Sequence, residues 1–598
     1  MEPSVNPEVQ ELPVGVPRYR RKVESFLESN SLRLEDVDLY LAILDGDGEI
    51  LAGGGLKGDV IKCVAVGAEA RSQGLAAPLV SRLVALAFER GVTSLKVFTK
   101  PENVSIFQSL GFSLLAQAPK AVLMENGRGL EEYCAYLRSL RQTGRCGVIV
   151  MNANPFTLGH RYLVQKALEQ VQHVFIIPVR EENHFPYSER LEMIRAGVAS
   201  FGKRVTVADG SAYCISAATF PTYFLKELSD AAETQMRLDV NLFQTHISPA
   251  LGSPVRFVGS EPSDPLTARY NAILQELMPG GVVEIPRLEA ISASVVRRSA
   301  FIPASELTPA STHPFLLSSL ACEALRAEAG APMKPGLVGP DSPGAHKDMS
   351  YPMMLSSITA IRPFFPRMAR AASAEELRQA GIDAEEAMLA ATGGVNTHRG
   401  AIFAVGLMLA AAGPAAMREP EPADYQSFIS SRLPRIAQSI LANKLAGSEL
   451  HLTHGEEAVD KYKVKGAMQM ALDGYKELFG DWLPYYRSVK GSEYALQRTL
   501  LHIMSTLDDT CIIHRAGFNR AQQVKREAAG LLGIAGQAEE IAGQAGNDDK
   551  RAGNDVFVTK LREMCERYAA EGISPGGCAD MLSLTLFADS ILPNNNNN

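Results

Sequence analysis

The stretch Cys146–His160, which reads CGVIVMNANPFTLGH, decides how the middle of this chain folds. Its first part, Cys146–Met151, is a continuous apolar run of the kind found in buried strands of parallel sheets. A helical pattern follows over Gly159–Gln172, and a second apolar run over Val174–Val179. Strand, helix and strand in this order predict a βαβ unit in a parallel sheet. Further strands are predicted at Arg204–Ala208, Arg256–Val258 and Val282–Ile285.

The turn between the first strand and the helix is typical of a phosphate-binding site. Gly159 lets the backbone approach a ligand closely. The helix that begins there offers free N–H groups and the positive end of its dipole. His160 can donate a hydrogen bond to an α-phosphate as charge develops on it. A plain helix cap, with Thr157 as the N-cap residue, is the alternative for the same residues.

A second strand-to-helix junction lies about 130 residues further on, where Val282–Ile285 leads to ISASVVR. Ser292 and Ser294 could cap the next helix. With Arg297, the same hydroxyls would also suit the β- and γ-phosphates of a nucleotide. The two junctions together resemble the nucleotidyltransferase superfamily, whose members attack the α-phosphorus of ATP and release pyrophosphate.

Four longer stretches resemble citrate lyase ligase. They are VMNANPFTLGHRYLV, HFPYSERLEMI, ISAATFPTYFLK and RFVGSEPSDPLTARYN, and the similarity covers about residues 20 to 300. The resemblance implies that acetate is adenylated with ATP, and that the acetyl group passes to the thiol of a dephospho-CoA-type prosthetic group on the citrate lyase acyl carrier subunit. It implies an ATP site of Asn152, Asn154, Thr157, Gly159, His160, Ser292, Ser294 and Arg297, with His160 also catalytic.

Two arginines near these motifs are additional candidates for the ATP site. Arg180 follows the second predicted strand, and Arg190 lies in HFPYSERLEMI. A solvent-exposed charge on a helix or loop is the alternative for both.

The first segment of the chain predicts a separate sheet domain. Alternating apolar positions at Val37–Leu44 and short runs at Glu49–Ala52 and Val60–Val66 surround an Asp-Gly hairpin turn. A helical pattern at Leu75–Arg90 and a strand at Ser94–Phe98 follow.

The stretch RSQGLA, Arg71–Ala76, resembles the glycine-containing turn of GNAT acetyltransferases. FTKPENVSIFQSLGF resembles the end of the same fold. In that family, backbone N–H groups at a helix start hold the CoA pyrophosphate. The resemblance makes Arg71, Gly74 and Ala76 the candidates for binding a pantetheine-linked phosphate. No general base is evident in this segment, so we expect a binding module for the carrier's prosthetic arm.

The composition changes after the second segment. IPASELTPASTHP, Ile302–Pro314, is typical of a linker. Beyond it, strand patterns nearly vanish and helical ones dominate. Examples of these patterns are Leu316–Ala329, Ser373–Ala380, Gly400–Ala412 and Leu496–Met504.

Polar motifs recur through this helical segment. They are MKPGLVGPDSPGAHKDM, TGGVNTHRGAIF, TLDDTCIIHRAG and ISPGGCADMLSLTLF. As a set they resemble triphosphoribosyl-dephospho-CoA synthase over about residues 316 to 590. That family joins the triphosphoribosyl part of ATP to the 2′-hydroxyl of 3′-dephospho-CoA and expels adenine. The resemblance implies a second nucleotide site of Gly344, His346, Asn396, Thr397, His398 and Arg515.

The acids of this segment are the candidates for proton transfer and for binding a metal. Asp508 and Asp509 are predicted on a helix that starts near Leu496, where they could hold Mg²⁺ bound to a triphosphate. A helix-terminal charge pair is the alternative. The 2′-hydroxyl must also lose its proton to a base, and Asp348, Asp508 and Asp509 are the candidates for this catalytic role.

The overall composition excludes several classes of protein. The chain has 598 residues, 46% of them hydrophobic and 21% charged, as in ordinary globular proteins. A net charge of −8 disfavours a nucleic-acid partner. Its eight cysteines include no Cys-x-x-Cys pair, so we expect a reducing, cytoplasmic setting. The longest apolar stretch, Ala401–Ala412, is too short to span a membrane.

The sequence therefore predicts a multidomain, bifunctional enzyme of citrate lyase maturation. We expect an α+β GNAT-like domain (1–143), an α/β Rossmann-like nucleotidyltransferase domain (144–301), a linker (302–315) and a mostly α domain (316–598). Its expected partners are acetate, ATP, 3′-dephospho-CoA and the acyl carrier subunit. Two alternatives remain: an adenylyltransferase of coenzyme A synthesis, and a scaffold that binds CoA-like ligands through an inactive synthase half. Gly339 and Cys511, which depart from the synthase pattern, favour the scaffold.

Overall fold

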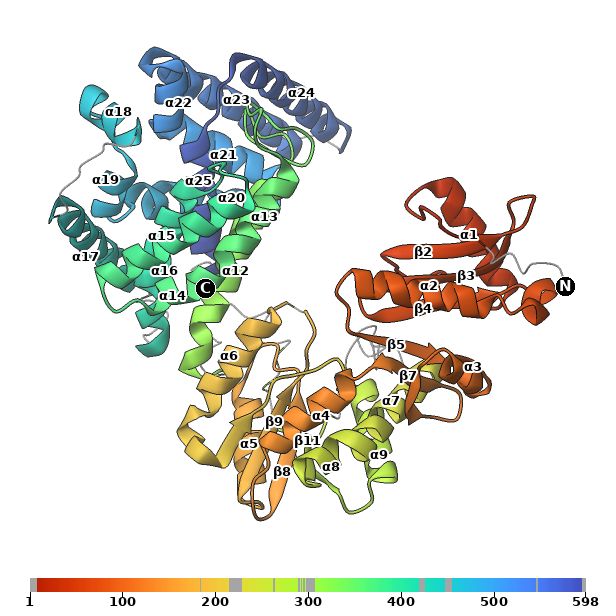
Figure 1. The fold of residues 1–598 in the computed structure, drawn as a ribbon. Coiled ribbons are helices and arrows are strands. Elements are labelled where there is room, and N and C mark those ends of the chain that lie inside the picture. Colours follow the sequence, from red (N-terminus) through yellow and green to blue (C-terminus); the bar gives the residue numbers. More distant parts are fainter. Residues whose placement is uncertain are drawn as a thin grey trace. The chain divides into compact units, whose positions relative to one another are not determined.

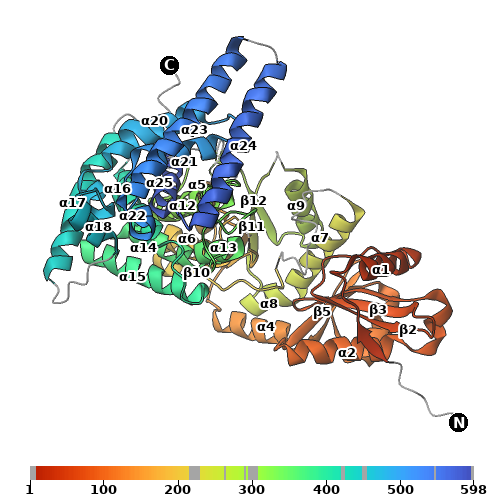
Figure 2. The same cartoon turned by 90° about the horizontal axis from the view of Figure 1, so that it is seen from above.

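The computed structural model divides the chain into two compact units (Figures 1 and 2). The first unit comprises Met1–Asn154 and Gly159–Ala290, and the second comprises Pro155–Leu158 and Ile291–Asn598. The structure describes residues 8–182, 184–214, 229–261, 264–288, 291, 293, 296, 307–418, 425–446, 454–544 and 547–593.

The first unit begins with a seven-stranded mixed sheet in the order β1-β2-β3-β4-β5-β7-β6. Its strands are β1 Val9–Glu11, β2 Leu39–Leu44, β3 Ile50–Lys57, β4 Val60–Val66, β5 Ser94–Thr99, β6 Ser113–Gln117 and β7 Val122–Gly127. Neighbours pair antiparallel except β4 and β5, which are parallel and pair only at Val60–Lys96 and Ile61–Val97. The sheet is therefore splayed beyond these pairs. This arrangement confirms the GNAT-like fold predicted from the sequence.

The described α-helices between these strands are α1 Pro17–Ser29, α2 Ala76–Glu89 and α3 Val104–Ser109. The next helix, α4 Gly129–Ser139, follows β7, and its buried residues belong to the core of the second sheet. The buried residues of α2, including Leu79 and Leu83, recur at helical spacing and pack on the sheet. Glycines in β3 allow this close packing, because a Cβ at Gly54 would lie 3.1 Å from Leu83.

The second sheet of this unit is entirely parallel, in the order β10-β9-β8-β11-β12. Its strands are β8 Cys146–Met151, β9 His173–Pro178, β10 Val205–Val207, β11 Val255–Gly259 and β12 Val282–Ile285. The helices are α5 Leu158–Leu168, α6 Tyr187–Val198, α7 Asp230–Leu242, α8 Ser248–Leu251 and α9 Pro265–Leu277. The chain moves outward from β8 to β9 and β10, then returns to the other side of β8 with β11. The predicted parallel α/β sheet is thus confirmed.

All the regular secondary structure described within residues 307–593 is helical. Its helices are α12 His313–Gly330, α13 Tyr351–Ile361, α14 Phe365–Arg370, α15 Ala374–Ala391, α16 Arg399–Arg418, α17 Tyr425–Ala446, α18 His454–Tyr462, α19 Ala467–Leu472, α20 Leu483–Val489, α21 Ala495–Thr506, α22 Thr510–Ala516, α23 Phe518–Gln544, α24 Asn547–Glu571 and α25 Gly576–Ile591. The apolar α25 packs against α12, α16 and α21 in one shared core. None of the described helices has both the length and the apolarity needed to cross a bilayer.

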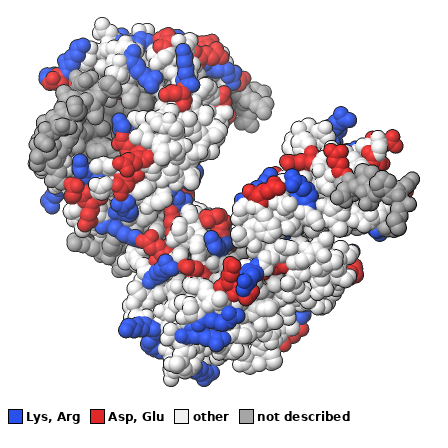
Figure 3. All heavy atoms as spheres, in the orientation of Figure 1, with Lys and Arg blue, Asp and Glu red and all other residues white. Residues whose placement is uncertain are grey.

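Acidic and basic side chains are interspersed over most of the face drawn in Figure 3. Because the net charge of the protein is −8, the field of the whole protein does not hold an anionic substrate. Local groups of hydrogen-bond donors have to hold it.

Candidate active sites

The first candidate site lies at the carboxyl ends of β8, β11 and β12. Ligands of open α/β sheets bind where the strand order reverses, which here is between β8 and β11. Asn152 directly follows β8, and Gly159 and His160 lie in the first turn of α5. Glu261 follows β11, and Arg287 follows β12. The parallel sheet therefore brings a helix start, an imidazole and a guanidinium to one edge.

His160 is neutral at physiological pH. Burial, and then the nearby positive charge of Arg287, lower the pKa of His160 to about 4. The ring is therefore a hydrogen-bond donor without a charge of its own, while Arg287 supplies the positive charge beside it. This combination suits the oxygens of a phosphate during nucleophilic attack.

Arg287 is held in place by the loop after β11. Its backbone N–H donates to Ser260 Oγ at 3.0 Å, and its guanidinium pairs with Glu261. Burial raises the pKa of Glu261, and Arg287 opposes that rise. The sequence analysis missed Arg287. The available signal was its position two residues after a predicted strand, at the same edge of the sheet as Asn152 after β8.

Arg190 has a structural role in this site. The side chain is fully buried and donates to the backbone carbonyls of Asn152 at 2.7 Å, Val179 at 3.0 Å and Phe185 at 3.1 Å. It thus ties the loops after β8 and β9 together, and it is not the solvent-exposed charge considered from the sequence. Arg180 is exposed and lies over the Tyr187 ring.

The two asparagines of the turn also hold the loops. Asn152 Oδ1 accepts from Arg190 at 3.1 Å, and Asn154 Oδ1 accepts from the Phe185 N–H at 3.1 Å. These contacts fix the peptide that precedes α5, and with it the position of His160. Their predicted role in binding ATP stays a prediction.

The other residues predicted for the ATP site are one described residue, Thr157, and three that are not described. Thr157 belongs to the second unit and is buried. Within that unit its neighbours are fixed, because Leu158 N–H donates to Leu307 O at 2.9 Å and Thr312 Oγ1 donates to Phe156 O at 3.2 Å. The predicted phosphate residues Ser292, Ser294 and Arg297 lie outside the described residues.

The predicted phosphate turn of the GNAT-like sheet has the required backbone shape. A 3-10 helix, Ala68–Gln73, ends at Gly74, whose φ of 72° is left-handed, and α2 begins at Ala76. Arg71 is exposed and makes only long hydrogen bonds of 3.4 Å, to Val66 O and Asn30 Oδ1. Its guanidinium is therefore available to a ligand.

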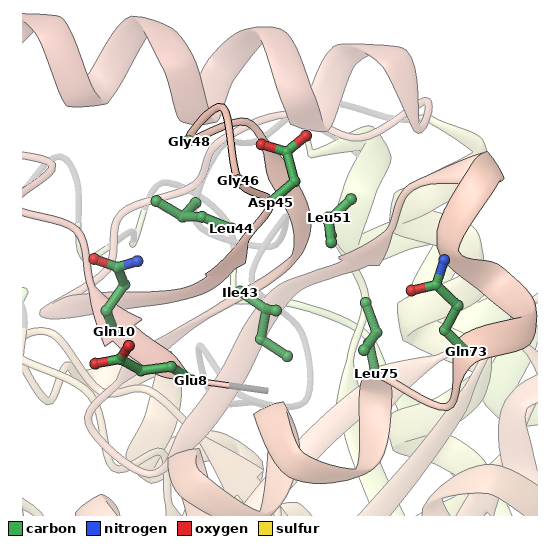
Figure 4. Close-up of a pocket in the computed structure, with 10 residues that line it drawn as sticks. All are labelled: Glu8, Gln10, Ile43, Leu44, Asp45, Gly46, Gly48, Leu51, Gln73 and Leu75. Atoms are coloured by element: carbon green, nitrogen blue, oxygen red, sulfur yellow. The ribbon is translucent and has the colours of Figure 1, made fainter. Parts of the chain in front are cut away.

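A cavity of about 610 Å³ adjoins this turn (Figure 4). Gln73 and Leu75 of the turn line it on one side, and Glu8 and Gln10 lie on the opposite side in the close-up. The Asp45–Gly48 hairpin turn and β2 and β3 complete the lining.

The second candidate site lies in the helical unit, where the structure changes the interpretation of Asp508 and Asp509. The sequence predicts the pair on a helix, but α21 ends at Thr506 and both acids lie in the turn before α22. Asp509 is buried and accepts from the backbone N–H groups of Cys511 at 2.8 Å, Ile512 at 3.2 Å and Cys578 at 2.8 Å. It therefore caps the N-terminus of α22 and also binds the first turn of α25.

These contacts do not fit the predicted metal pair. Both Asp509 oxygens already accept amide hydrogens. Asp508 Oδ1 accepts from Lys525 and Gln522, each at 2.8 Å. Within the part of the chain that the structure describes, no group of three or more His, Cys, Asp or Glu side chains could hold a metal ion. Asp508 and Asp509 are thus not arranged as the ligands of a resident Mg²⁺.

The motif around His346 is brought to the start of α25. His346 Nε2 and Ser574 Oγ lie 2.8 Å apart, and Gly344 packs so closely on Gly336 and Leu337 that a Cβ there would lie 2.5 Å from Leu337 O. Burial, and next the positive charge of Arg515, lower the pKa of His346. The exposed Arg515 therefore lies near His346, and Asp348 Oδ1 lies 3.9 Å from His346 Nδ1 although the Asp348 side chain is 64% exposed.

The Asn-Thr-His trio precedes α16. Asn396 Oδ1 accepts from the Arg399 N–H at 3.1 Å, so it caps this helix. Thr397 Oγ1 donates to Ser357 Oγ at 2.7 Å, and His398 Nδ1 lies 2.8 Å from the same hydroxyl. Burial, and to a smaller extent Lys334, lower the pKa of His398 to about 4. His398 is therefore neutral and fixed, and only Asn396 is exposed.

Comparisons with known proteins match the two halves separately. Residues 146–316 match the citrate lyase ligase C-terminal domain, and residues 314–598 match the ATP:dephospho-CoA triphosphoribosyl transferase family. The [citrate [pro-3S]-lyase] ligase of Haemophilus influenzae is 41% identical over 293 residues, which cover 46% of this chain and 87% of that protein.

The C-terminal half also matches curated relatives along most of their length. The probable 2-(5″-triphosphoribosyl)-3′-dephosphocoenzyme-A synthase of Pseudomonas savastanoi pv. phaseolicola is 36% identical over 304 residues, covering 48% of this chain and 96% of that protein.

A solved Klebsiella pneumoniae structure, provisionally described as an acyl-CoA N-acyltransferase, is 19% identical with a TM-score of 0.18, covering 20% of this chain and 95% of that one. The chain therefore belongs to the citrate lyase ligase family through its N-terminal half and to the triphosphoribosyl-dephospho-CoA synthase family through its C-terminal half.

Proposed function

We propose that two separate sites carry the two activities of this citrate lyase maturation enzyme. The ligase activity belongs to the parallel sheet of the first unit, and the triphosphoribosyl-dephospho-CoA synthase activity to the helices of the second. The observation that carries this assignment is that each half covers nearly a whole single-function relative, 87% of one and 96% of the other. This observation also disfavours the coenzyme A adenylyltransferase and the inactive scaffold.

In the ligase reaction, the acetate carboxylate attacks the α-phosphorus of ATP and pyrophosphate leaves. His160 donates a hydrogen bond to an α-phosphate oxygen as negative charge builds on it, and Arg287 balances that charge. The carrier's thiol then attacks the acetyl carbonyl, and AMP leaves. We assign Gly159 to the close approach of the phosphates. Asn152, Asn154, Thr157, Ser292, Ser294 and Arg297 stay in the proposal as ATP-binding residues on the sequence resemblance.

In the synthase reaction, the 2′-hydroxyl of 3′-dephospho-CoA replaces adenine on the anomeric carbon of the ATP ribose. ATP enters as its Mg²⁺ complex, so the metal arrives with the substrate. We propose that Arg515 and Lys525 face the triphosphate, because both carry positive charge beside the Asp508–Asp509 turn. Gly344, His346, Asn396, Thr397 and His398 shape the nucleotide site.

The GNAT-like sheet would bind the prosthetic arm of the carrier and guide its thiol toward acetyl-AMP. The left-handed turn at Gly74 before α2, together with the exposed Arg71, suits the negative phosphates of that arm. The splayed edge between β4 and β5 leaves room for the pantetheine part. The domain is then a binding module and does not use acetyl-CoA.

Product analysis tests the two assignments on the wild-type chain. With ATP, acetate and deacetylated carrier we expect AMP, pyrophosphate and an acetylated carrier, and with ATP and 3′-dephospho-CoA we expect adenine. AMP attached to a pantetheine acceptor without acetate would instead establish the adenylyltransferase alternative. No adenine with 3′-dephospho-CoA would establish an inactive second half.

Replacing Arg71 with glutamate tests the GNAT-like module. The reversed charge should raise the KM for the carrier roughly tenfold, equivalent to about 1.4 kcal/mol, while acetyl-AMP formation from free acetate stays unchanged. Arg82→Glu is the matched control, because Arg82 is exposed on α2 away from the turn. An unchanged carrier KM in Arg71→Glu, or acetyl transfer from acetyl-CoA without ATP, would contradict this role.

A further inference from the structure

Asp580 is an acid of the helical unit that the mechanism has not yet used. It lies in the second turn of α25, in the motif ISPGGCADM. Its carboxylate meets the N-terminus of α16, where the Ala401 N–H donates to it. Contact with this helix is very close, because a Cβ on Gly400 would lie 2.0 Å from Asp580 Oδ2. The glycine in THRGAIF therefore makes space for this carboxylate.

The surroundings of Asp580 favour a proton acceptor. Burial, followed by the negative charges of Asp509 and Glu328, raises the pKa of Asp580 well above its ordinary value. Those two neighbours are occupied: Asp509 accepts from three amides, and Glu328 pairs with the buried Lys334 at 2.5 Å. Among the described residues, no lysine, arginine or histidine lies within 4 Å of Asp580 to form an ion pair with it.

A buried hydroxyl lies near the same carboxylate. Tyr475 is 1% exposed, and its OH has no hydrogen-bond partner among the residues that the structure describes. The charge of Asp580 contributes to raising the Tyr475 pKa, after burial, so the two groups are close enough to interact. A buried polar atom without a partner costs free energy, and a hydroxyl-bearing substrate at Asp580 would give it one.

The other acids considered for proton transfer are less suited to it. The Asp348 side chain is 64% exposed, so solvent reaches it freely. Asp508 Oδ1 already accepts hydrogen bonds from Lys525 and Gln522, each at 2.8 Å. Asp509 has no free oxygen, because both accept backbone N–H groups. Asp580 is only partly exposed and has no cationic partner among the described residues.

We propose that Asp580 is the general base that accepts the proton of the 2′-hydroxyl of 3′-dephospho-CoA. This inference rests on the proposed synthase function. The 2′-oxygen forms a bond to the anomeric carbon of the ATP ribose. The bond from that carbon to adenine N9 breaks, and its electron pair stays on adenine. The hydroxyl proton moves to Asp580 and then to water, and the departing adenine takes up a proton from water.

Replacing Asp580 with asparagine tests this role. Because a positioned general base contributes roughly 10²–10⁴-fold, kcat for adenine release should fall by that factor, with less than about a threefold change in the KM for 3′-dephospho-CoA. The melting temperature should stay at or above that of the wild type, because the change removes a partly buried carboxylate that has no cationic partner among the described residues. Asp555→Asn on α24 is the matched control, since Asp555 is exposed.

The pH profile separates a base from a structural residue. Wild-type kcat should fall as the pH drops through the raised pKa of Asp580, and the residual rate of Asp580→Asn should lack this decrease. The other groups near it that titrate are Asp509, Glu328, Tyr475, Cys511 and Cys578. Burial raises the pKa of the tyrosine and the two cysteines, so these stay neutral near pH 7.

Gly400→Ala provides a second variant, which keeps the carboxylate but displaces it. Its Cβ should move Asp580 away from the start of α16 and lower kcat by a similar factor. A rate within about tenfold of the wild type in Asp580→Asn, or a normal rate in Gly400→Ala, would overturn the assignment. If the wild-type chain itself releases no adenine, both the proposed synthase function and the role of Asp580 are wrong. That outcome differs from one in which the wild-type chain releases adenine and only the prediction for the variants fails.

Discussion

Replacing His160 with alanine should lower acetate-dependent pyrophosphate release roughly 10²–10³-fold, because one hydrogen-bond donor to the developing charge is lost. The ring lies at the start of α5, where burial and Arg287 keep it neutral. Adenine release by the second unit of the same chain should be unchanged, and it serves as an internal control for folding and concentration. A ligase rate within threefold of the wild type would contradict the role of His160.

The low pKa of His160 adds a pH dependence. The folded-state pKa of about 4 lies below the ordinary value of 6.5, so the unfolded chain binds the extra proton first. The contribution of His160 to the free energy of unfolding is fully present above pH 6.5 and is lost as the pH falls toward 4. His160→Ala should therefore reduce the acid sensitivity of unfolding, measured by denaturant titrations at pH 7 and pH 5. An equally acid-sensitive variant would show that the histidine is exposed.

His160→Asn distinguishes a neutral donor from a cation. An asparagine keeps an N–H donor but can never carry a charge. If a neutral imidazole is what the reaction uses, this variant should retain more activity than His160→Ala at every pH between 6 and 8. Equal loss in the two variants would indicate that the position of the ring nitrogen matters more than its ability to donate.

The parallel sheet was predictable from the sequence because its central strands β8 and β9 are apolar on both faces. Cys146–Met151 and Val282–Ile285 have the predicted bounds, and the others differ by one residue at each end. The position of His160 at a helix start was also predictable, because a helix start after a buried strand has a known geometry. These features depend on local sequence, where periodicity and turn residues carry the information.

The contacts of buried polar side chains were not predictable in this way. Arg190 binds carbonyls in two loops, and the sequence does not reveal that those loops meet. Asp509 contacts Cys578, which is 69 positions later in the chain. The local part of its role had a signal, since an aspartate directly before a helical run is a common N-cap. The connection to α25 depends on tertiary packing.

Asp509→Ala should destabilise the helical unit strongly. The carboxylate accepts from the first turns of both α22 and α25, and loss of one N-cap typically costs about 0.5–2 kcal/mol. The three N–H groups would be left in a buried site, where each unpaired group costs about 1–3 kcal/mol. We expect a total loss of about 3 kcal/mol, which corresponds to a decrease in melting temperature of roughly 6–12 °C. Thermal unfolding of the full chain would measure it.

Asp508→Ala is the matched control at the neighbouring position. Its carboxylate is partly exposed and bound to Lys525, so the variant should lose only about 0–1 kcal/mol. A metal pair would give the opposite pattern. Both variants would then keep the wild-type melting temperature, and both would need more Mg²⁺ to reach the same rate of adenine release. That result would support the metal-binding role predicted for the two acids from the sequence. A large loss of stability in Asp509→Ala alone would instead identify this carboxylate as the cap that joins the start of α25 to α22. Since the same first turns of α25 place Asp580 against α16, the synthase rate of Asp509→Ala should fall in proportion to the unfolded fraction and recover on cooling.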